Sequence, residues 1–411
     1  MFAKIKNELL GYSVKERLFV LFAMLCGFFI TAEYAVVKPI SHSLFIATYG
    51  AKLFPLVWLI AIPVNFFVVS LYNRFVFKLG CFRTLLFSTI FSIFVFSFSA
   101  LFLAKIVWLP FLLYIFKDIY IMLLFQQLWS VIHATFPQNR AKYLYGIFFG
   151  VGGIGAALAS LIPGFLSVRY GSEKLLFIAP AFAVLLTICY GIALRMRGNF
   201  TPSDHKDSGG GLGLIKRSKT LQVILILVVC MQVSATLLEF QFHQNLQLQI
   251  PLQDLRTAYL GKLFSVVHTI NTFLQFAGSY LVVHFIGLRR AHLMIPTILG
   301  LGSISYLFSP NFALLSYNYG MIKSFDYSLF TILKEMLYVP LKVEEKFKAK
   351  AFIDVFAYRS SKAFASFILL LVPSGMILSC SLVGIFLFWL LVISRGLTSR
   401  KSATTMSEYV Q

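Results

Sequence analysis

Long apolar stretches separated by short polar ones make up most of the chain. About 20 apolar residues are enough for an α-helix to cross the hydrocarbon core of a bilayer. Such stretches form two sets of six. The first set lies near 18–37, 53–72, 84–104, 114–136, 143–166 and 174–194, and the second near 220–246, 258–284, 291–308, 312–338, 353–373 and 375–394. The pattern predicts an all-α integral membrane protein with about 12 transmembrane helices in two six-helix halves.

A polar segment separates the two sets and contains the run Ser208-Gly-Gly-Gly211. Ser/Gly composition of this kind cannot bury a core and is typical of a flexible connector. We therefore expect an N-terminal half over 1–194, a cytoplasmic linker over 195–219, a C-terminal half over 220–395 and a cytoplasmic tail over 396–411.

Composition supports a membrane protein and excludes a soluble one. Hydrophobic residues make up 59% of the chain and charged residues only 12%, whereas soluble domains are about 45–50% apolar and about 25% charged. The five cysteines form no CxxC pair, so neither a disulfide framework nor a zinc site is indicated.

The net charge of +21 is explained by membrane topology. Lys and Arg collect in the cytoplasmic loops of membrane proteins. If the N-terminus is cytoplasmic, 24 basic residues fall on that side and six on the other, namely Lys38, Lys52, Lys105, Arg169, Lys174 and Arg256. This bias predicts a bacterial inner-membrane protein with both termini in the cytoplasm, and it makes nucleic acid an improbable partner.

A weak internal repeat supports duplicated halves. The segments 78–83 and 284–290 each place a glycine, Gly80 or Gly287, shortly before Arg at a hairpin, six spans apart. Duplicated six-helix halves around a midplane site are the architecture of major-facilitator carriers. The glycines alone are equally compatible with a simple tight turn.

Charged residues inside the predicted spans are the most informative feature. A charge at mid-bilayer costs about 2.5–3.5 kcal/mol on insertion scales, so such groups face a water-filled cavity or pair with one another. The basic residues are Lys117, Lys262, Lys323, Lys334, Arg359 and Lys362, with Lys38 at the end of the first span. The acidic residues are Glu33, Asp118, Glu239, Asp326, Glu335 and Asp354.

Helical spacing suggests how some of these charges are arranged. Lys323 and Asp326, at i and i+3, can neutralise one another. Lys334 and Glu335 are adjacent and point about 100° apart on a helix, so Glu335 is not the natural partner of Lys334. For Lys323–Asp326 and Lys117–Asp118 a structural ion pair is favoured.

Lys334, Arg359 and Lys362 have fewer acids nearby in sequence, which leaves substrate binding and helix pairing equally open. Cations in a low-dielectric cavity suit phosphate or carboxylate. The spacing therefore favours an anionic substrate without identifying it.

Other motifs point away from an enzyme. Gly150-Val-Gly-Gly-Ile-Gly155 follows no strand and lies in an apolar span, so it favours close helix packing over dinucleotide binding. No P-loop is present, and the seven histidines show no metal-ligand spacing. We expect no catalytic residue, no cofactor and no metal.

The region from 334 to 367 resembles the ADP/ATP translocases, the nucleotide carriers of intracellular bacteria and plastids. The resemblance rests on Lys334-Glu-Met-Leu-Tyr-Val-Pro-Leu341, Lys348-Ala-Lys-Ala-Phe-Ile-Asp-Val355 and Arg359-Ser-Ser-Lys362. Weaker similarity covers Leu128-Trp129 and Tyr259-Leu-Gly-Lys262. The chain departs from the family at Ser41-His42, where a Lys-Asp pair is usual.

The resemblance implies a twelve-helix carrier that exchanges a nucleoside triphosphate for a diphosphate without hydrolysis. Two alternatives stay open, a proton-coupled symporter of another organic anion on the same fold and a non-transporting membrane protein. The expected partners are the lipid bilayer and a nucleotide or other anionic small molecule, and the oligomeric state is left open. The candidate substrate-binding residues are Lys334, Arg359, Lys362, Lys38, Lys262 and Tyr259, and the candidate coupling or ion-pair residues are Glu335, Asp354, Lys323, Asp326, Glu239, Lys117 and Asp118.

Overall fold

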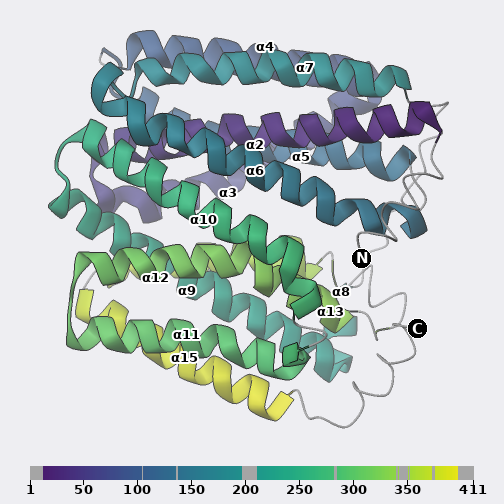
Figure 1. The fold of residues 1–411 in the computed structure, drawn as a ribbon. Helices are drawn as coiled ribbons and strands as arrows, with labels where there is room; N and C mark the ends of the chain where they lie inside the picture. The colour runs from purple at the N-terminus through teal and green to yellow at the C-terminus, as the bar shows by residue number, and fades with distance from the viewer. Residues whose placement is uncertain are drawn as a thin grey trace. The chain divides into compact units, whose positions relative to one another are not determined.

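A computed structural model describes residues 13–103, 105–135, 138–196, 211–281, 285–338, 341, 350, 352–372 and 375–396. Within these residues all regular secondary structure is helical, which confirms the predicted fold class (Figure 1). The main elements are α2 (Val14–Tyr49), η1 (Ala51–Leu53), α3 (Phe54–Leu79), α4 (Cys81–Phe102), α5 (Leu109–Thr135), α6 (Gln138–Tyr170), η2 (Lys174–Phe177), α7 (Ile178–Met196), α8 (Gly211–Arg217), α9 (Lys219–Gln249), α10 (Gln253–Leu281), α11 (Leu288–Phe308), α12 (Phe312–Phe325), η4 (Asp326–Phe330), α13 (Thr331–Tyr338), η6 (Phe352–Ala357), α14 (Tyr358–Leu371) and α15 (Gly375–Gly396).

Each predicted span overlaps a helix, but the expected number of twelve spans is not confirmed. Among the described helices, nine are long and apolar enough to cross a membrane. The predicted eighth span coincides with α10, which carries polar residues along its length. The π-helical turn η4 divides the predicted tenth span, and the π-helical turn η6 occupies the start of the predicted eleventh span, so that no single α-helix in either span reaches the length needed to cross a membrane.

The predicted linker is partly helical, because α8 occupies Gly211–Arg217. Residues 197–210, with most of the Ser/Gly run, and residues 397–411 of the predicted tail lie outside the described part. The predicted division into halves at 195–219 stays a prediction.

The glycines of the internal repeat adopt the same unusual backbone conformation. Gly80 has φ 78° and ψ 165°, and Gly287 has φ 77° and ψ 149°, and each residue is the N-cap of the next helix. This region of φ/ψ space is essentially restricted to glycine. The repeat therefore marks two equivalent turns, before α4 and before α11, that require glycine.

By packing, the chain divides into two compact units. Unit 1 comprises Met1–Ala51, Pro63–His205 and Ile250–Phe276, and unit 2 comprises Lys52–Ile62, Lys206–Gln249 and Ala277–Gln411. Helix α3 changes unit at Pro63, a proline inside the helix.

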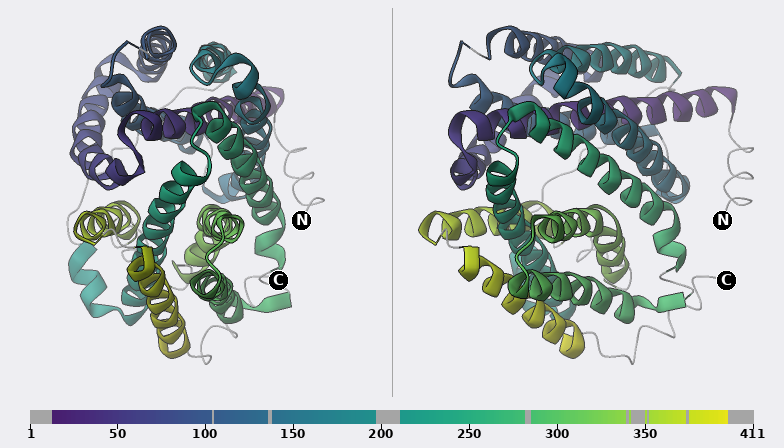
Figure 2. Two further views of the ribbon diagram at one scale, coloured as in Figure 1. Left: turned by 90° about the vertical axis from the view of Figure 1, so that its left-hand side faces the viewer. Right: turned by 60° about the vertical axis from the view of Figure 1, so that its left-hand side comes forward.

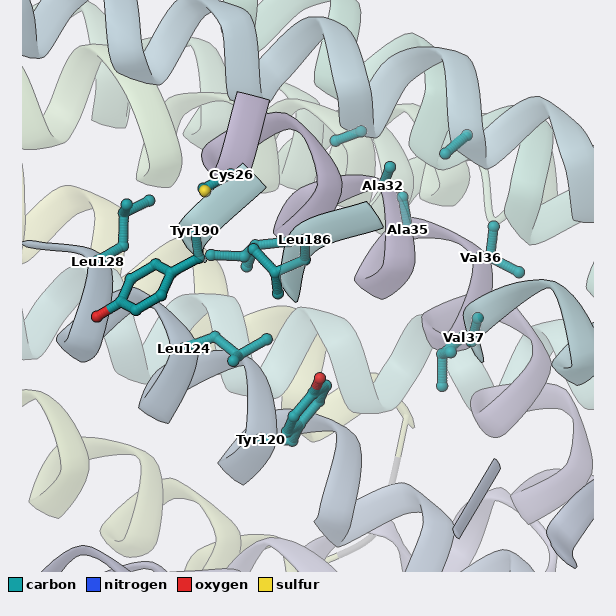
Figure 3. Packing of buried hydrophobic residues seen from close by; sticks show 14 of the residues in the cluster. Cys26, Ala32, Ala35, Val36, Val37, Tyr120, Leu124, Leu128, Leu186 and Tyr190 are labelled. Carbon is teal, nitrogen blue, oxygen red and sulfur yellow. The ribbon is translucent and has the colours of Figure 1, made fainter. Parts of the chain in front are cut away.

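In unit 1 the centre is α2, which packs against α5, α6 and α7. Its buried face contributes Cys26, Ala32, Ala35, Val36 and Val37 to an apolar cluster (Figure 3). The labelled part of that cluster is completed by Tyr120, Leu124 and Leu128 of α5 and by Leu186 and Tyr190 of α7. Helices α4 and α7 lie side by side at the edge of the unit (Figure 1).

In unit 2 the central element is α9, which packs against α12, α14 and α15. Helices α11 and α15 lie side by side, as all views of the ribbon show (Figures 1 and 2). In both units large apolar side chains are exposed on the outer helices, for example Phe67, Phe87 and Phe94 in unit 1 and Phe364 and Phe367 in unit 2. Such a surface is expected where lipid, not water, is the solvent.

Helices α6 and α10 cross in close contact within unit 1. A Cβ atom added at Gly261 would lie 2.5 Å from the backbone nitrogen of Gly164 and 2.8 Å from the carbonyl oxygen of Ser160. On the same face of α6, an added Cβ at Gly153 would lie 2.1 Å from Oγ1 of Thr272. The glycines of α6 thus serve close helix packing.

Polar contacts hold the start of α10 in unit 1. The Asp254 carboxylate accepts hydrogen bonds from the Ser172 backbone N–H at 2.8 Å and the Ser172 hydroxyl at 2.5 Å. The Ser167 hydroxyl donates to the Asp254 carbonyl at 3.0 Å, and the Ser43 hydroxyl donates to the Gln253 carbonyl at 2.6 Å. The guanidinium of buried Arg256 donates to the Ser43 carbonyl at 3.3 Å. We call Ser43, Ser167, Ser172, Asp254 and Arg256 the polar clasp.

Candidate functional site

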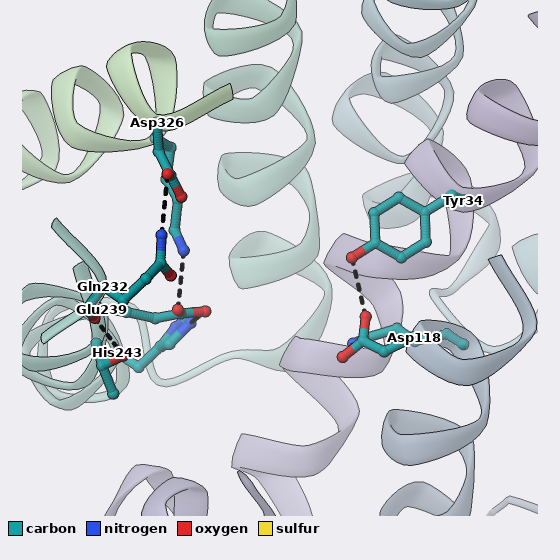
Figure 4. A network of polar contacts seen from close by, with 9 residues as sticks. Tyr34, Asp118, Gln232, Glu239, His243 and Asp326 are labelled. Atoms are coloured by element: carbon teal, nitrogen blue, oxygen red, sulfur yellow. Dashed lines mark hydrogen bonds and ion pairs between the residues drawn. The ribbon is translucent and has the colours of Figure 1, made fainter. Parts of the chain in front are cut away.

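An ion pair between α9 and α12 lies at the centre of unit 2. The Lys323 ammonium donates to the Glu239 carboxylate at 2.9 Å, and the two side chains are less than a tenth exposed. Nε2 of His243, one turn along α9, lies 3.9 Å from the other Glu239 oxygen, and its ring stacks on Phe54 at 4.6 Å (Figure 4).

The predicted partner of Lys323 was wrong. The Asp326 carboxylate instead accepts a hydrogen bond from the Gln232 side chain at 3.0 Å (Figure 4). The cause is local, because the α-helix ends at Phe325 and Asp326 opens the π-helical turn η4. The i,i+3 geometry of a regular α-helix therefore does not apply. π-Helical turns are frequent at functional sites.

A second ion pair joins α13 to η6. The Lys334 ammonium lies 2.7 Å from the Asp354 carboxylate, with 14% and 24% of the two side chains exposed. Asp354, like Asp326, belongs to a π-helical turn. Glu335 pairs with Lys350, so the adjacent Lys334 and Glu335 have different partners, as their positions on the helix predicted. Pro340 and Lys348, which belong to the stretch that resembles the ADP/ATP translocases, lie outside the described residues.

Lys362 has an aromatic partner. Its ammonium lies 4.9 Å from the centre of the Trp58 ring, and Trp58 stacks on Phe54 at 5.5 Å. Among the residues that the structure describes, no acidic side chain forms an ion pair with Lys362. Arg359 is half-buried on the same helix, α14. The Lys362 ammonium also lies within electrostatic range of the Glu239 carboxylate, which forms its close ion pair with Lys323.

In unit 1 the candidate residues form a chain from α2 to α5 and α10. The Lys38 ammonium lies 4.3 Å from the centre of the Phe264 ring and 5.5 Å from that of Tyr34. The Tyr34 hydroxyl donates to Asp118 at 2.9 Å (Figure 4). Asp118 pairs with Lys117 at 2.9 Å, as predicted, although their adjacent positions point them in different directions.

Lys262 and Tyr259 lie on α10 near the crossing with α6. The Lys262 ammonium lies 5.1 Å from the Phe165 ring and the side chain is exposed, while Tyr259 is half-buried. In unit 1, then, the ammonium groups of Lys38 and Lys262 both pack on aromatic rings.

Sequence reasoning missed the aromatic partners of these lysines. Trp58, Phe54, Phe165 and Phe264 lie in apolar stretches where a ring is indistinguishable from ordinary lipid-facing or core packing. Gln232, one helical turn before Thr236 and two before Glu239, gave a weak signal, because a buried amide in a span needs a polar partner.

Comparison with known protein families identifies the superfamily to which the chain belongs. The Major Facilitator Superfamily model matches residues 124–333, about half of the chain. The chain belongs to the major facilitator superfamily. The TLC ATP/ADP transporter model matches residues 316–399, the region that contains Lys323, Lys334, Asp354, Arg359 and Lys362. The predicted resemblance to the ADP/ATP translocases is thereby confirmed, and the protein is a multi-pass membrane protein.

Similarity to individual members of this superfamily is low in sequence. ADP,ATP carrier protein 1 of Chlamydia trachomatis serovar D is 24% identical over 305 residues, which are 62% of this chain and 56% of that protein. Chloroplastic ADP,ATP carrier protein 1 of Arabidopsis thaliana is 27% identical over 270 residues, 55% of this chain and 42% of that protein. The chain thus spans about half the length of the curated relatives it matches.

Solved major-facilitator structures share the fold. The nucleoside transporter NupG superposes with a TM-score of 0.65 at 11% identity, covering 93% of this chain and 100% of that one. A bacterial homologue of the iron transporter ferroportin, in an inward-facing state, gives 0.66 at 12% identity, covering 94% and 100%. The matching families and structures are transporters, as expected of a carrier and not of an enzyme.

Proposed function

We propose that this protein exchanges a nucleoside triphosphate for a diphosphate across a membrane by alternating access. The observation that carries the proposal is the placement of the translocase-like stretch 316–399. This stretch contains Lys334, Arg359 and Lys362; the Lys362 ammonium packs on the Trp58 ring and, among the described residues, forms no close ion pair with an acid.

The charges in this stretch suit a polyphosphate. Arg359 presents a fork of donors and the lysines present point charges, and both types bind phosphate oxygens. Lys334 is held by Asp354 in the structure, so the anion replaces a carboxylate when it engages Lys334. In unit 1, we assign phosphate binding to Lys38 and Lys262. We assign stacking on the nucleotide base to the ring of Tyr259.

The remaining candidates are proposed to hold the helices or to couple movement to binding. Glu239 and Lys323 pair two helices in the core of unit 2, and Lys117 and Asp118 link α5 to α2 through Tyr34. Asp326 and Glu335 complete this set. We further propose a bacterial inner membrane and cytoplasmic termini, on the distribution of Lys and Arg along the chain.

Exchange is tested with purified full-length protein in liposomes. Vesicles loaded with ADP should take up labelled ATP, and vesicles loaded with buffer alone should not. Lys362→Gln is expected to lower the initial rate by at least about tenfold, because one charge-assisted contact to phosphate is worth roughly 1.5–3 kcal/mol. Lys105→Gln, at an exposed lysine between α4 and α5, is the matched control.

Two results would contradict nucleotide exchange, and a third would contradict the role of Lys362. No uptake of any nucleotide from either side would exclude nucleotide exchange. Uptake that needs no internal substrate and stops when an uncoupler is added would instead establish the proton-coupled symport of an anion. Equal rates for wild type and Lys362→Gln would remove Lys362 from the binding site.

A further inference from the structure

A buried carboxyl group in unit 1 is used by none of the contacts above. Glu33 lies in the middle of α2 and is 2% exposed. Among the described residues, neither of its side-chain oxygens makes a hydrogen bond of good geometry, and the Tyr120 hydroxyl is the side-chain group that lies close enough to interact with it. Buried polar groups are nearly always satisfied by hydrogen bonds, and a buried charge without a partner carries a large free-energy cost. A group of this kind therefore needs an explanation in terms of a bound species.

Glu33 faces a small cavity between α2, α4 and α5. The cavity has room for about one water molecule. Its polar lining is Glu33 and Tyr34 of α2 with Lys117 and Tyr120 of α5, while α4 contributes Phe96. The Tyr120 hydroxyl is buried beside the Glu33 carboxyl and, within the described part of the chain, it also makes no hydrogen bond of good geometry; Figure 3 shows Tyr120 on the same helix as Leu124. The oxygens of Glu33 and Tyr120 therefore lie at the wall of the same small cavity.

The neighbouring charges decide which species fits. Apart from Glu33, the charged side chain in the lining is Lys117. Its positive ammonium group would repel a metal cation bound in the same cavity. The cavity is too small for an organic ion. A proton, carried by water, meets both conditions, since it neutralises the carboxyl and turns it into a hydrogen-bond donor.

We propose that Glu33 is a proton-binding site that is protonated in this conformation and releases its proton when the cavity opens to water. The step is balanced without any co-reactant. A carboxylate oxygen takes a proton from hydronium on binding, and the O–H bond breaks towards water on release. The proposal does not depend on which anion the carrier moves.

A route from this site to the cations of unit 1 is present. Lys117 pairs with Asp118, and Asp118 also accepts the Tyr34 hydroxyl. When Glu33 ionises, it competes with Asp118 for Lys117. Loss of that pairing alters the contact of Tyr34, the ring on which Lys38 packs at 5.5 Å. Proton release at Glu33 therefore changes the surroundings of a proposed substrate cation on the same helix.

Infrared difference spectroscopy of the purified full-length protein, without nucleotide, tests the proposal. The neutral carboxylic acid should give a carbonyl stretching band at neutral pH that Glu33→Gln abolishes. Glu173→Gln, at a half-buried acid of the α6–α7 connection, should retain the band. In liposomes, the initial transport rate of Glu33→Gln should lose the pH dependence of the wild type.

Absence of the band in the wild type, or its survival in Glu33→Gln, would overturn the proposal. A pH profile of transport that is unchanged in Glu33→Gln would also do so. If Glu33→Gln does not fold, Tyr120→Phe provides the second variant. It should shift the same band, because its hydroxyl lines the same cavity, and an unshifted band counts against the site. Since the spectra need no substrate, the infrared outcomes are independent of the nucleotide experiment.

Discussion

At the scale of single residues, this membrane protein keeps charged groups in its core by giving most of them partners far away in sequence. Lys323 and Glu239 are separated by 84 positions and meet at 2.9 Å. Removing one member of such a pair leaves the other as an uncompensated buried charge, which costs more than the pair itself contributes. This asymmetry leads to a measurable difference between single and double variants.

Lys323→Met is expected to lower the free energy of unfolding by about 3–5 kcal/mol, because Glu239 then stays buried without its close ion-pair partner. The double variant Lys323→Met/Glu239→Gln should recover most of that loss. Reversible unfolding in SDS measures both. Losses that simply add would show that the two groups are not coupled.

Asp354→Asn should strengthen binding of an anion at Lys334. The substrate no longer competes with a carboxylate for the ammonium, and for a partly exposed pair this amounts to about 1 kcal/mol, or roughly fivefold in the dissociation constant. Calorimetric titration with ADP measures the effect. Weaker binding in the variant would instead show that Asp354 positions Lys334 for the substrate.

Residue pairing could be predicted only where it is local. The separate partners of Lys334 and Glu335 followed from helix geometry, whereas the Lys117–Asp118 pair followed only from the adjacency of the two residues in sequence. Glu239 as the partner of Lys323, and the isolation of Glu33, depend on which helices pack together. Helical periodicity describes one helix at a time and cannot provide that information.

At the scale of elements, the positions of the helices were predictable because an apolar stretch long enough to cross a bilayer directly indicates a helix. All twelve predicted stretches overlap described helices. The π-helical turns at Asp326–Phe330 and Phe352–Ala357 were not predicted, because the widened turn depends on tertiary contacts such as Gln232–Asp326 and leaves no mark in the hydrophobic pattern. The glycine run in α6 predicted close packing but could not identify α10 as a partner.

Gly261→Ala is expected to destabilise the α6–α10 crossing by about 1–3 kcal/mol, the usual cost of overpacking. The new methyl group would meet backbone atoms of α6, which cannot rotate away. Gly384→Ala in α15 is the control, since nothing lies within 4 Å of its added Cβ, and it should be neutral or stabilising. Thermal unfolding in detergent compares the two. Equal behaviour would contradict the close crossing.

At the scale of the whole molecule, the polar clasp ties the α9–α10 connection to unit 1. Asp254→Ala removes the acceptor of both Ser172 hydrogen bonds. Amide hydrogen exchange over 250–262 should accelerate about tenfold, equivalent to about 1.4 kcal/mol of lost local stability. Glu173→Ala, next to Ser172, serves as the control. Unchanged exchange in Asp254→Ala would show that packing alone holds this connection.

The boundaries of the two units have a consequence for expressing the protein as separate fragments. Unit 2 includes Lys52–Ile62 from the first part of the chain, and unit 1 includes Ile250–Phe276 from the second. A gene divided between α7 and α8 would therefore produce two polypeptides, each of which lacks a segment of its own unit and carries one that belongs to the other. Neither fragment should be stable when synthesised alone, whereas co-synthesis of both should restore a protein that can be purified as a complex.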